Sequence, residues 1–342
     1  MLASAPLSAQ TIAPPQVPLD VKGRDGVKAY LVTVVDSVNT AAADLKTAAT
    51  AYADLAQQAG GPAEAAKSKP AEVAAQIKKL REAYQRIDSF GYEYVEGIVA
   101  GVPSLSKYDE ELDSGLPRKD AVSPNDIVAN VVIKAGPDTL DREGSLNNFL
   151  IEPTVFGTND KFIVGKATLP GFSEPVGLPK PQLIVALADY AVDGYARLRK
   201  DARAWQPNNQ DCFQAVYAMT PTLADYFDEW KETKKGGGSM GGRFVAVSRV
   251  SDMRGIMSSV QLTWDGLSED VKAKDPALAE SVSRGYGQIM KFIDTVDARD
   301  QAKPLNIETI DALGSQAKER ADKLTVQAAQ AAALLGVNVE AK

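Results

Sequence analysis

"VKAYLVTVVDSVNTAAADLKTAATAYADLAQQAGG", residues 27–61, is the stretch that most clearly indicates the fold class. Its apolar side chains recur every three or four residues, the spacing that places them on one face of an α-helix. The stretch ends in a glycine pair, a common signal for the end of a helix. We therefore expect one long amphipathic helix whose buried face consists of Val27, Tyr30, Leu31, Val34, Val35, Val38, Ala42 and Leu45.

The same helical period continues through much of the remaining chain. Residues 70–99 repeat it, and residues 123–133, "SPNDIVANVVI", open with a serine cap and a proline in the first turn. Strand signals are weak throughout, so the sequence predicts an all-α fold. Five further helical segments are expected, beginning near Gln182, Gln210, Gly242, Asp275 and Asn306.

Residues 152–181, "EPTVFGTNDKFIVGKATLPGFSEPVGLPKP", differ from the rest of the chain. Glycine and proline are dense and no helical period holds, which indicates a long connection with room for a short hairpin. Because loops of this length are uncommon within one compact domain, we interpret the segment as the crossing between two antiparallel bundles of the four-helix type. The predicted organisation is a disordered N-terminal segment over 1–24, a first bundle over 25–151, the connection, and a second bundle over 182–342.

The first residues, "MLASAPLSAQTIAPPQVP" (1–18), combine small side chains with a proline-rich run that cannot be helical. Small residues of this kind precede the cleavage site of a secretory signal. We therefore interpret residues 1–24 as the remnant of an export signal with its linker, and expect a periplasmic or extracellular protein. The alternative is a cytosolic protein with a flexible N-terminus.

The composition excludes several functional classes. The net charge is −7, whereas binding to nucleic acid or to an anionic membrane surface needs clustered Lys and Arg. No run of about 18 apolar residues occurs, so no transmembrane segment is expected. The chain has no histidine and one cysteine, which excludes histidine-based catalysis, histidine-based zinc or haem sites, thiolate metal sites and an intrachain disulfide. Any bound metal must be held by oxygen, the ligand of hard cations such as Ca²⁺, Mg²⁺ and Fe³⁺.

Two other features have structural interpretations. The glycine-rich stretch "KKGGGSMGGR", residues 234–243, lacks the spacing of a phosphate-binding loop and follows no predicted strand, so we expect a flexible loop between helices. The lone Cys212 lies in the apolar segment "DCFQAVYAM" and is expected to be a small core residue.

Residues 89–115, "SFGYEYVEGIVAGVPSLSKYDEELDSG", hold the main candidate binding residues. On a continuous helix at about 100° per residue, Glu93 and Glu96 project opposite the apolar face, where water could solvate them. Three features favour burial instead: residues 89–91 form a helix break, tyrosines flank the two acids, and the run that follows is apolar on all sides. Buried carboxylates would need a cation or another partner, since burying an isolated charge is costly.

The segment "GYEYVE", residues 91–96, resembles the G-x-H-x-x-E motif of the imelysin-like family, with Glu93 in the place of the histidine. That family includes EfeO-type periplasmic iron-uptake proteins, and algal Fea-type iron-assimilating proteins look related to it. Other segments resemble this group in the same order and, together, cover most of the chain: "AGVPSLSKYDEELDSG", "NNFLIEPTVFGT", "TLADYFDEWKET", "FVAVSRVSDMRGIMSSVQLTWDGL" and "AKERADKLTVQAAQAAALLG".

The resemblance implies two four-helix bundles, an iron or other metal site in the cleft between them, and export from the cytoplasm. By motif it carries over only to Glu93 and Glu96. Some relatives were described as metallopeptidases with a zinc-type H-x-x-E motif, which is absent here. Without histidine, peptidase activity has no physical support, and a site made of oxygen ligands prefers ferric iron to zinc.

Acids in "KYDEELDSG" are further candidates for the same site. Asp109 and Asp113 follow the helix by one loop and can fold back to it. The alternative is that these acids cap or solvate a turn, an interpretation that we favour for Glu110 and Glu111.

Two more candidates lie in the second half of the chain. Asp252 and Arg254 interrupt an apolar helix, where charge is seldom buried unpaired; the alternative to a binding role is that they pair with other charges. Tyr226 offers a phenol oxygen, a good ligand for ferric iron, although an aromatic side chain near a helix end is usually part of the core.

Three functional hypotheses follow. The first is an exported, non-enzymatic iron-binding protein that holds Fe³⁺ rather than Fe²⁺, or another hard cation such as Ca²⁺, and presents it to a membrane iron transporter or keeps it near the cell surface. The second is an exported helical module that binds a partner protein or a small ligand without metal. The third, a hydrolase, is disfavoured by the missing histidine. The predicted metal ligands are Glu93, Glu96, Asp109, Asp113 and Asp252.

Overall fold

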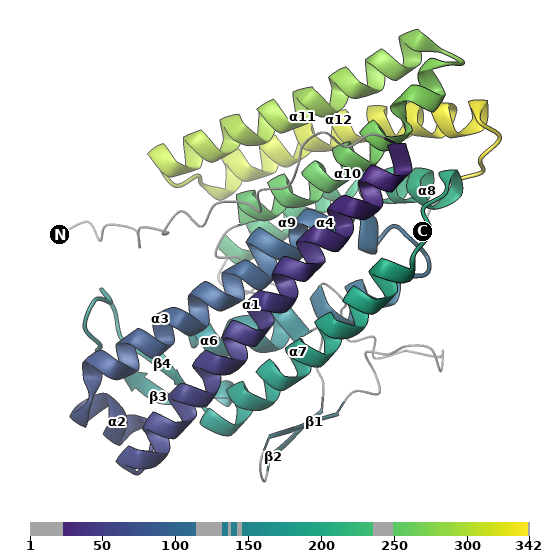
Figure 1. Cartoon of the computed structure of the whole chain (residues 1–342). Helices are drawn as coiled ribbons and strands as arrows, with labels where there is room; N and C mark the ends of the chain where they lie inside the picture. Colours follow the sequence, from purple (N-terminus) through teal and green to yellow (C-terminus); the bar gives the residue numbers. More distant parts are fainter. Residues whose placement is uncertain (1–22, 114–131, 136–137, 142–145, 235–248, 341–342) are drawn as a thin grey trace.

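The computed structural model describes residues 23–113, 132–135, 138–141, 146–234 and 249–340, and it is all-α, as predicted (Figure 1). Two small antiparallel hairpins accompany the helices in the described part of the chain: β1 (Val132–Ala135) with β2 (Asp138–Asp141), and β3 (Ile163–Ala167) with β4 (Val176–Pro179). The helices are α1 (Gly23–Ala59), α2 (Pro62–Ser68), α3 (Pro70–Ile87), α4 (Glu93–Val99), α5 (Ser106–Tyr108), α6 (Glu152–Phe156), α7 (Pro181–Ala204), α8 (Asn209–Met219), α9 (Thr222–Lys234), α10 (Arg249–Lys272), α11 (Pro276–Ala302) and α12 (Ile307–Leu334).

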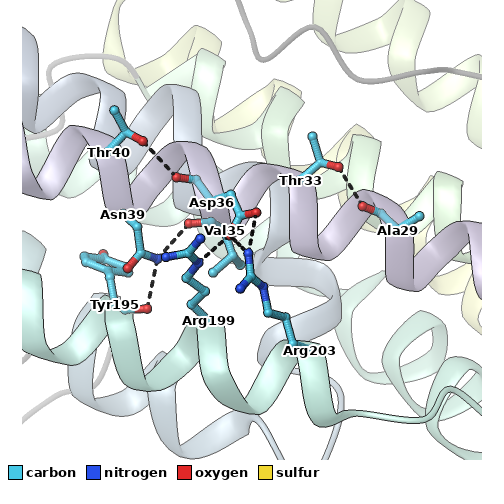
Figure 2. Close-up of polar contacts among 9 residues, drawn as sticks. All are labelled: Ala29, Thr33, Val35, Asp36, Asn39, Thr40, Tyr195, Arg199 and Arg203. Carbon is cyan, nitrogen blue, oxygen red and sulfur yellow. Dashed lines mark hydrogen bonds and ion pairs between the residues drawn. The ribbon is translucent and has the colours of Figure 1, made fainter.

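One group of helices is built around α1, which packs against α3 and α7. Every residue of the predicted apolar face of α1 is buried. Polar contacts also join α1 to α7, as Figure 2 shows: Asp36 accepts hydrogen bonds from Arg199 and Arg203. Nδ2 of Asn39 donates to the backbone carbonyl of Tyr195 at 3.0 Å. This bond fixes the α7 backbone at Tyr195, whose hydroxyl belongs to the site described below.

A second group is built around α10, which packs against α4, α8 and α11. In Figure 1, α11 and α12 run side by side along one edge of the molecule. The two groups do not follow the order of the chain, because α7 lies along α1 and α4 lies along α10. The predicted domain boundaries, 25–151 and 182–342, stay a prediction.

The segment predicted as a connection, residues 152–181, contains α6, a 3₁₀ turn and the β3–β4 hairpin, for which the sequence left room. The helix starts predicted near Asp275 and Asn306 are confirmed. The side chain of each residue accepts a hydrogen bond from the backbone N–H three positions later, so each caps a helix N-terminus.

Two predicted elements need correction. The helix predicted over 123–133 is wrong at its end, because Val132 and Ile133 pair with β2 as part of a strand; the residues before them lie outside the described ranges. The single segment predicted from Gln210 is two helices, α8 and α9, since Pro221 follows α8 and cannot continue its hydrogen bonding. Residues 1–22 and nearly all of the glycine-rich stretch also lie outside the described ranges.

The helix α4 is buried on every side, as its apolar sequence predicted, and it lies against α10 at close range. Glycines permit this approach. A Cβ atom on Gly255 of α10 would lie 2.8 Å from Cβ of Glu93 and 3.0 Å from its carbonyl carbon. A Cβ atom on Gly97 of α4 would lie 2.7 Å from a methyl group of Val260. Neither position has room for a side chain, so these glycines determine where Glu93 lies.

We expect Gly255→Ala to destabilise the protein by about 1–3 kcal/mol, because the added methyl group must push α10 away from Glu93. Gly287→Ala is the matched control. Gly287 lies inside α11, and an added Cβ would have no described atom within 4 Å, so helix propensity should make this change neutral or stabilising by up to about 1 kcal/mol. Urea unfolding measures both free energies. Equal stability of the two variants would contradict the close approach of α4 and α10.

Candidate metal centre

Three π-helical turns carry many side chains of the site: Asp88–Tyr92, Asp109–Asp113 and Asn147–Ile151. Turns of this kind are wider than an α-helical turn and are frequent at functional sites. The first lies between α3 and α4, so it rotates the side chains of α4 relative to those of α3. This rotation is the reason that Glu93 and Glu96 do not reach the wet face on which a continuous helix would place them. The solvated interpretation is wrong, and the buried one is confirmed.

Glu93 and Glu96 are 2% and 4% exposed. The hydroxyl of Tyr226 contacts both: it lies 2.8 Å from Oε2 of Glu93 and is hydrogen-bonded to Oε2 of Glu96. Its one proton can serve only one carboxylate at a time. Burial, followed by the charge of Glu96, raises the pKa of Glu93 well above its usual value. Burial, followed by the charges of Asp109 and Asp113, does the same to the pKa of Glu96.

Five carboxylates form two overlapping groups around this pair. Asp88, Glu93 and Asp113 each place one oxygen within 4.8 Å of the other two. Glu96, Asp109 and Asp113 do the same, so Asp113 belongs to both groups. Asp109 is half-buried and the other four are buried. Because hard cations bind oxygen at about 2.0–2.6 Å, each group is compact enough to surround one cation.

Two tyrosines support these acids. Tyr84 donates a hydrogen bond to Oδ2 of Asp88 at 2.8 Å, and Tyr92 donates to Oδ1 of Asp109 at 3.1 Å. Burial, reinforced by the neighbouring carboxylates, raises the pKa of both phenols well above the usual value. These hydroxyls therefore stay protonated at neutral pH and act as hydrogen-bond donors to the carboxylates unless a cation displaces the protons.

Asn147 lies between two of the acids. Its Nδ2 is 3.0 Å from Oδ1 of Asp88, 3.1 Å from Oδ1 of Asp113 and 2.8 Å from the Tyr195 hydroxyl. An amide nitrogen carries two protons, so it cannot serve all three acceptors at once. Asn147 is 0% exposed, and its carbonyl oxygen has no hydrogen-bond partner among the described residues. A buried carbonyl without a partner is unusual and is available to a ligand.

A buried cation, Arg249, lies beside the centre at the start of α10. Its guanidinium is 3.1 Å from Glu229 and 3.7 Å from Asp252, and it lies over the ring of Tyr226 at 5.2 Å. Burial raises the pKa of Asp252 to about 7, against the opposing effect of Arg249. The charge of Asp252 in turn raises the pKa of Glu93. Asp252 therefore adjoins the centre without belonging to either group of three.

Of the five predicted ligands, the structure brings four together in the two groups, Glu93, Glu96, Asp109 and Asp113. The fifth, Asp252, lies next to them, and one of its oxygens, Oδ1, is buried without a hydrogen-bond partner among the described residues. Whether these oxygens bind a metal stays a prediction. The arrangement is suited chemically to holding a hard cation or to sharing protons among carboxylates.

The other two acids of the segment "KYDEELDSG", Glu110 and Glu111, differ in burial. Glu110 is exposed, in agreement with the solvated interpretation. That interpretation is wrong for Glu111, which is 1% exposed, because Arg197 forms two hydrogen bonds with its carboxylate and Tyr190 donates a third. This ion pair faces α7 and does not join the two groups of three.

The charge pairing considered for Arg254 is confirmed: it binds Asp294 at 3.0 Å and Asp297 at 2.9 Å, both on α11. Cys212 is buried, as expected of a core residue. The sequence reasoning missed Asp88 and Asn147. Two adjacent amides in the apolar run "NNFLIEP" are the signal that could have identified Asn147, since buried amides need partners.

Comparisons with known proteins leave the family assignment open. No protein-family model matches the chain, and the search of curated proteins finds no match. The resemblance to the imelysin-like family therefore stays a prediction from the segments quoted above. Among the described helices, none combines the length and the apolar character that crossing a membrane requires.

Proposed function

We propose that this protein is an exported, non-enzymatic iron-binding protein whose cargo is held by the carboxylates of the centre. The observation that carries the proposal is the burial of Glu93, Glu96, Asp88 and Asp113 together. Burying one carboxylate is costly, and burying four side by side adds their mutual repulsion. A cation in their midst would offset both effects. Iron assimilation is also the function that the resemblance to the imelysin-like family implies.

The ligand chemistry supports ferric iron among the hard cations. Carboxylates suit several of these ions. Tyr226, whose hydroxyl contacts both glutamates, adds a phenol oxygen, which ferric iron binds well and Ca²⁺ does not need. The residue set has no imidazole or thiolate to favour zinc. Ferric iron in preference to Fe²⁺ is therefore the proposed cargo, with Ca²⁺ as the next hard cation to test.

The protein would act by binding and release rather than by catalysis. Burial and the charges of neighbouring acids raise the pKa values of Glu93, Glu96 and Asp113, which favours their protonated forms in the metal-free protein. A cation would displace these protons, and renewed protonation would help to release it. Delivery to a membrane iron transporter, after export to the periplasm or the cell surface, is the role that we propose for such reversible binding.

The direct test is a titration of the metal-free chain with Fe³⁺, supplied as its citrate complex, followed by calorimetry and by thermal unfolding. At a free-ion concentration about 100 times the dissociation constant, the native state should gain about 2.7 kcal/mol. Parallel titrations with Ca²⁺, Mg²⁺ and Zn²⁺ establish the preference. A melting temperature that none of these ions changes would contradict the proposal and favour a module that binds a partner protein or a small ligand without metal.

Tyr226→Phe tests the phenol as a ligand. A phenolate bound to ferric iron gives a visible charge-transfer absorption band, so the wild-type complex should be coloured and the variant should lose the band. Affinity should fall by about 10-fold or more, since changes close to a metal site typically weaken binding by about 10–100-fold. The control is Tyr217→Phe, which changes a half-buried tyrosine of α8. This variant should retain the absorption band and the iron affinity of the wild type. A band of unchanged intensity in Tyr226→Phe would exclude this tyrosine from the shell.

A further inference from the structure

The five carboxylates form two groups of three rather than one group of five, and Asp113 is common to both. An ion that binds oxygen at about 2.0–2.6 Å has room for the three oxygens of either group around it. A carboxylate has two oxygens, so Asp113 can give one to each of two ions. Two-metal sites hold their ions about 3.5–4 Å apart in this way.

The charge of the centre also favours two ions. When they are ionised, the five carboxylates carry five negative charges. One ferric ion supplies three positive charges and leaves two carboxylates to keep protons or remain charged in a buried site, which is unfavourable. Two divalent ions supply four positive charges and two trivalent ions supply six. Against the five negative charges of the carboxylates, either pair leaves a net charge of only one.

A buried oxygen outside the acids points to a ligand as well. The carbonyl of Asn147 is fully buried and has no hydrogen-bond partner in the described part of the chain, and its amide lies against Asp88 and Asp113. Amide carbonyls are ordinary ligands of hard cations. The amide nitrogen faces these acids, and rotation of the amide about its terminal bond would bring the carbonyl oxygen to the first group in its place. The phenol oxygens that contact Glu96 and Asp109 would complete the second.

We infer that the centre takes two hard cations side by side, bridged by Asp113. The inference rests on the proposed function and adds to it the number of ions and their connection. One ion is held by Asp88, Glu93 and the Asn147 carbonyl, and the other by Glu96 and Asp109. Each chain then carries two ions as cargo, and the two ions influence each other through the shared carboxylate.

The test is the number of Fe³⁺ ions bound per chain, measured by equilibrium dialysis against ferric citrate and metal analysis, together with electron paramagnetic resonance. We expect two ions per wild-type chain and a weak signal, because a carboxylate bridge couples the two spins. Asp109→Asn weakens only the second position, so the second equivalent should bind at least about 10-fold more weakly and the signal of an isolated ferric ion should appear. Asp88→Asn should do the same to the first position. Glu110→Gln, an exposed neighbour, should keep two coupled ions.

The outcomes separate this inference from the proposed function. One ion per wild-type chain, with the signal of an isolated ferric ion, overturns the two-ion centre and leaves the iron-binding proposal standing. Two ions that both give isolated signals overturn the shared bridge. No bound iron overturns the proposed function itself. The wild-type measurement decides among these results even where a variant fails to fold.

Discussion

Replacing Glu93 and Glu96 together by glutamine is expected to lower the affinity for ferric iron by at least about 100-fold. The change removes two anionic oxygen ligands and keeps the volume of both side chains. Supporting residues outside the ligand shell already contribute about 10–100-fold to metal affinity, so the loss of two ligands should exceed that range. The carbonyl oxygens of the new amides can still accept the hydrogen bond of Tyr226, which limits structural disturbance.

The stability of the metal-free double variant shows whether the loss of iron affinity comes from the missing ligands or from a less stable fold. In the metal-free wild type, burial and the neighbouring acids disfavour the charged forms of Glu93 and Glu96, so amides that are always neutral should unfold at the same temperature as the wild type or higher. Glu110→Gln removes one exposed acid from the neighbouring loop and should change iron affinity by less than about twofold. A double variant that is folded and binds iron within threefold of wild type would refute the assignment of these glutamates as ligands.

The parts of the fold that depend on local pattern could be predicted from the sequence. The apolar period of residues 27–61 identified the buried face of α1 residue by residue. The sequence placed the starts of two helices near Asp275 and Asn306, and the structure shows that the side chains of both residues cap backbone N–H groups there. The all-round apolar character of residues 91–102 indicated that α4 is buried. Each of these features follows from a few neighbouring residues.

The features that escaped prediction depend on distant contacts or on irregular backbone. The π-helical turn at residues 88–92 brings Asp88 to the same centre as Glu93, five positions later, whereas a regular α-helix would point the two apart. Asn147, which was missed, reaches the centre from another part of the chain, whereas Tyr226, already a candidate from the sequence, does contact both glutamates. The packing of α7 along α1 and of α4 along α10 could not be predicted from local sequence patterns, because such pairings depend on tertiary contacts between distant segments.

The second large effect concerns pH, and its sign differs between the metal-free and the iron-loaded protein. In the metal-free protein the pKa values of Glu93, Glu96 and Asp113 are raised, and that of Asp252 is raised to about 7. A carboxyl group with a raised pKa stabilises the folded state while it is protonated. This contribution is complete below the unfolded values of about 4 and is lost as pH rises through the folded values. Relative to a variant with Asp252→Asn, the metal-free wild type should therefore become less stable between about pH 4 and pH 8.

The affinity for iron should instead rise with pH, because the ion must displace the same protons that stabilise the metal-free site. Each displaced proton lowers the affinity by about 10-fold per unit of pH below the pKa, so two displaced protons give about 100-fold per unit. Calorimetry at pH 6 in two buffers with different enthalpies of ionisation measures directly how many protons leave per bound ion. We expect at least one for the wild type and fewer for Glu93→Gln. Binding without proton release at pH 6 would show that the buried carboxylates are already ionised, and the account of iron release by protonation would then be wrong.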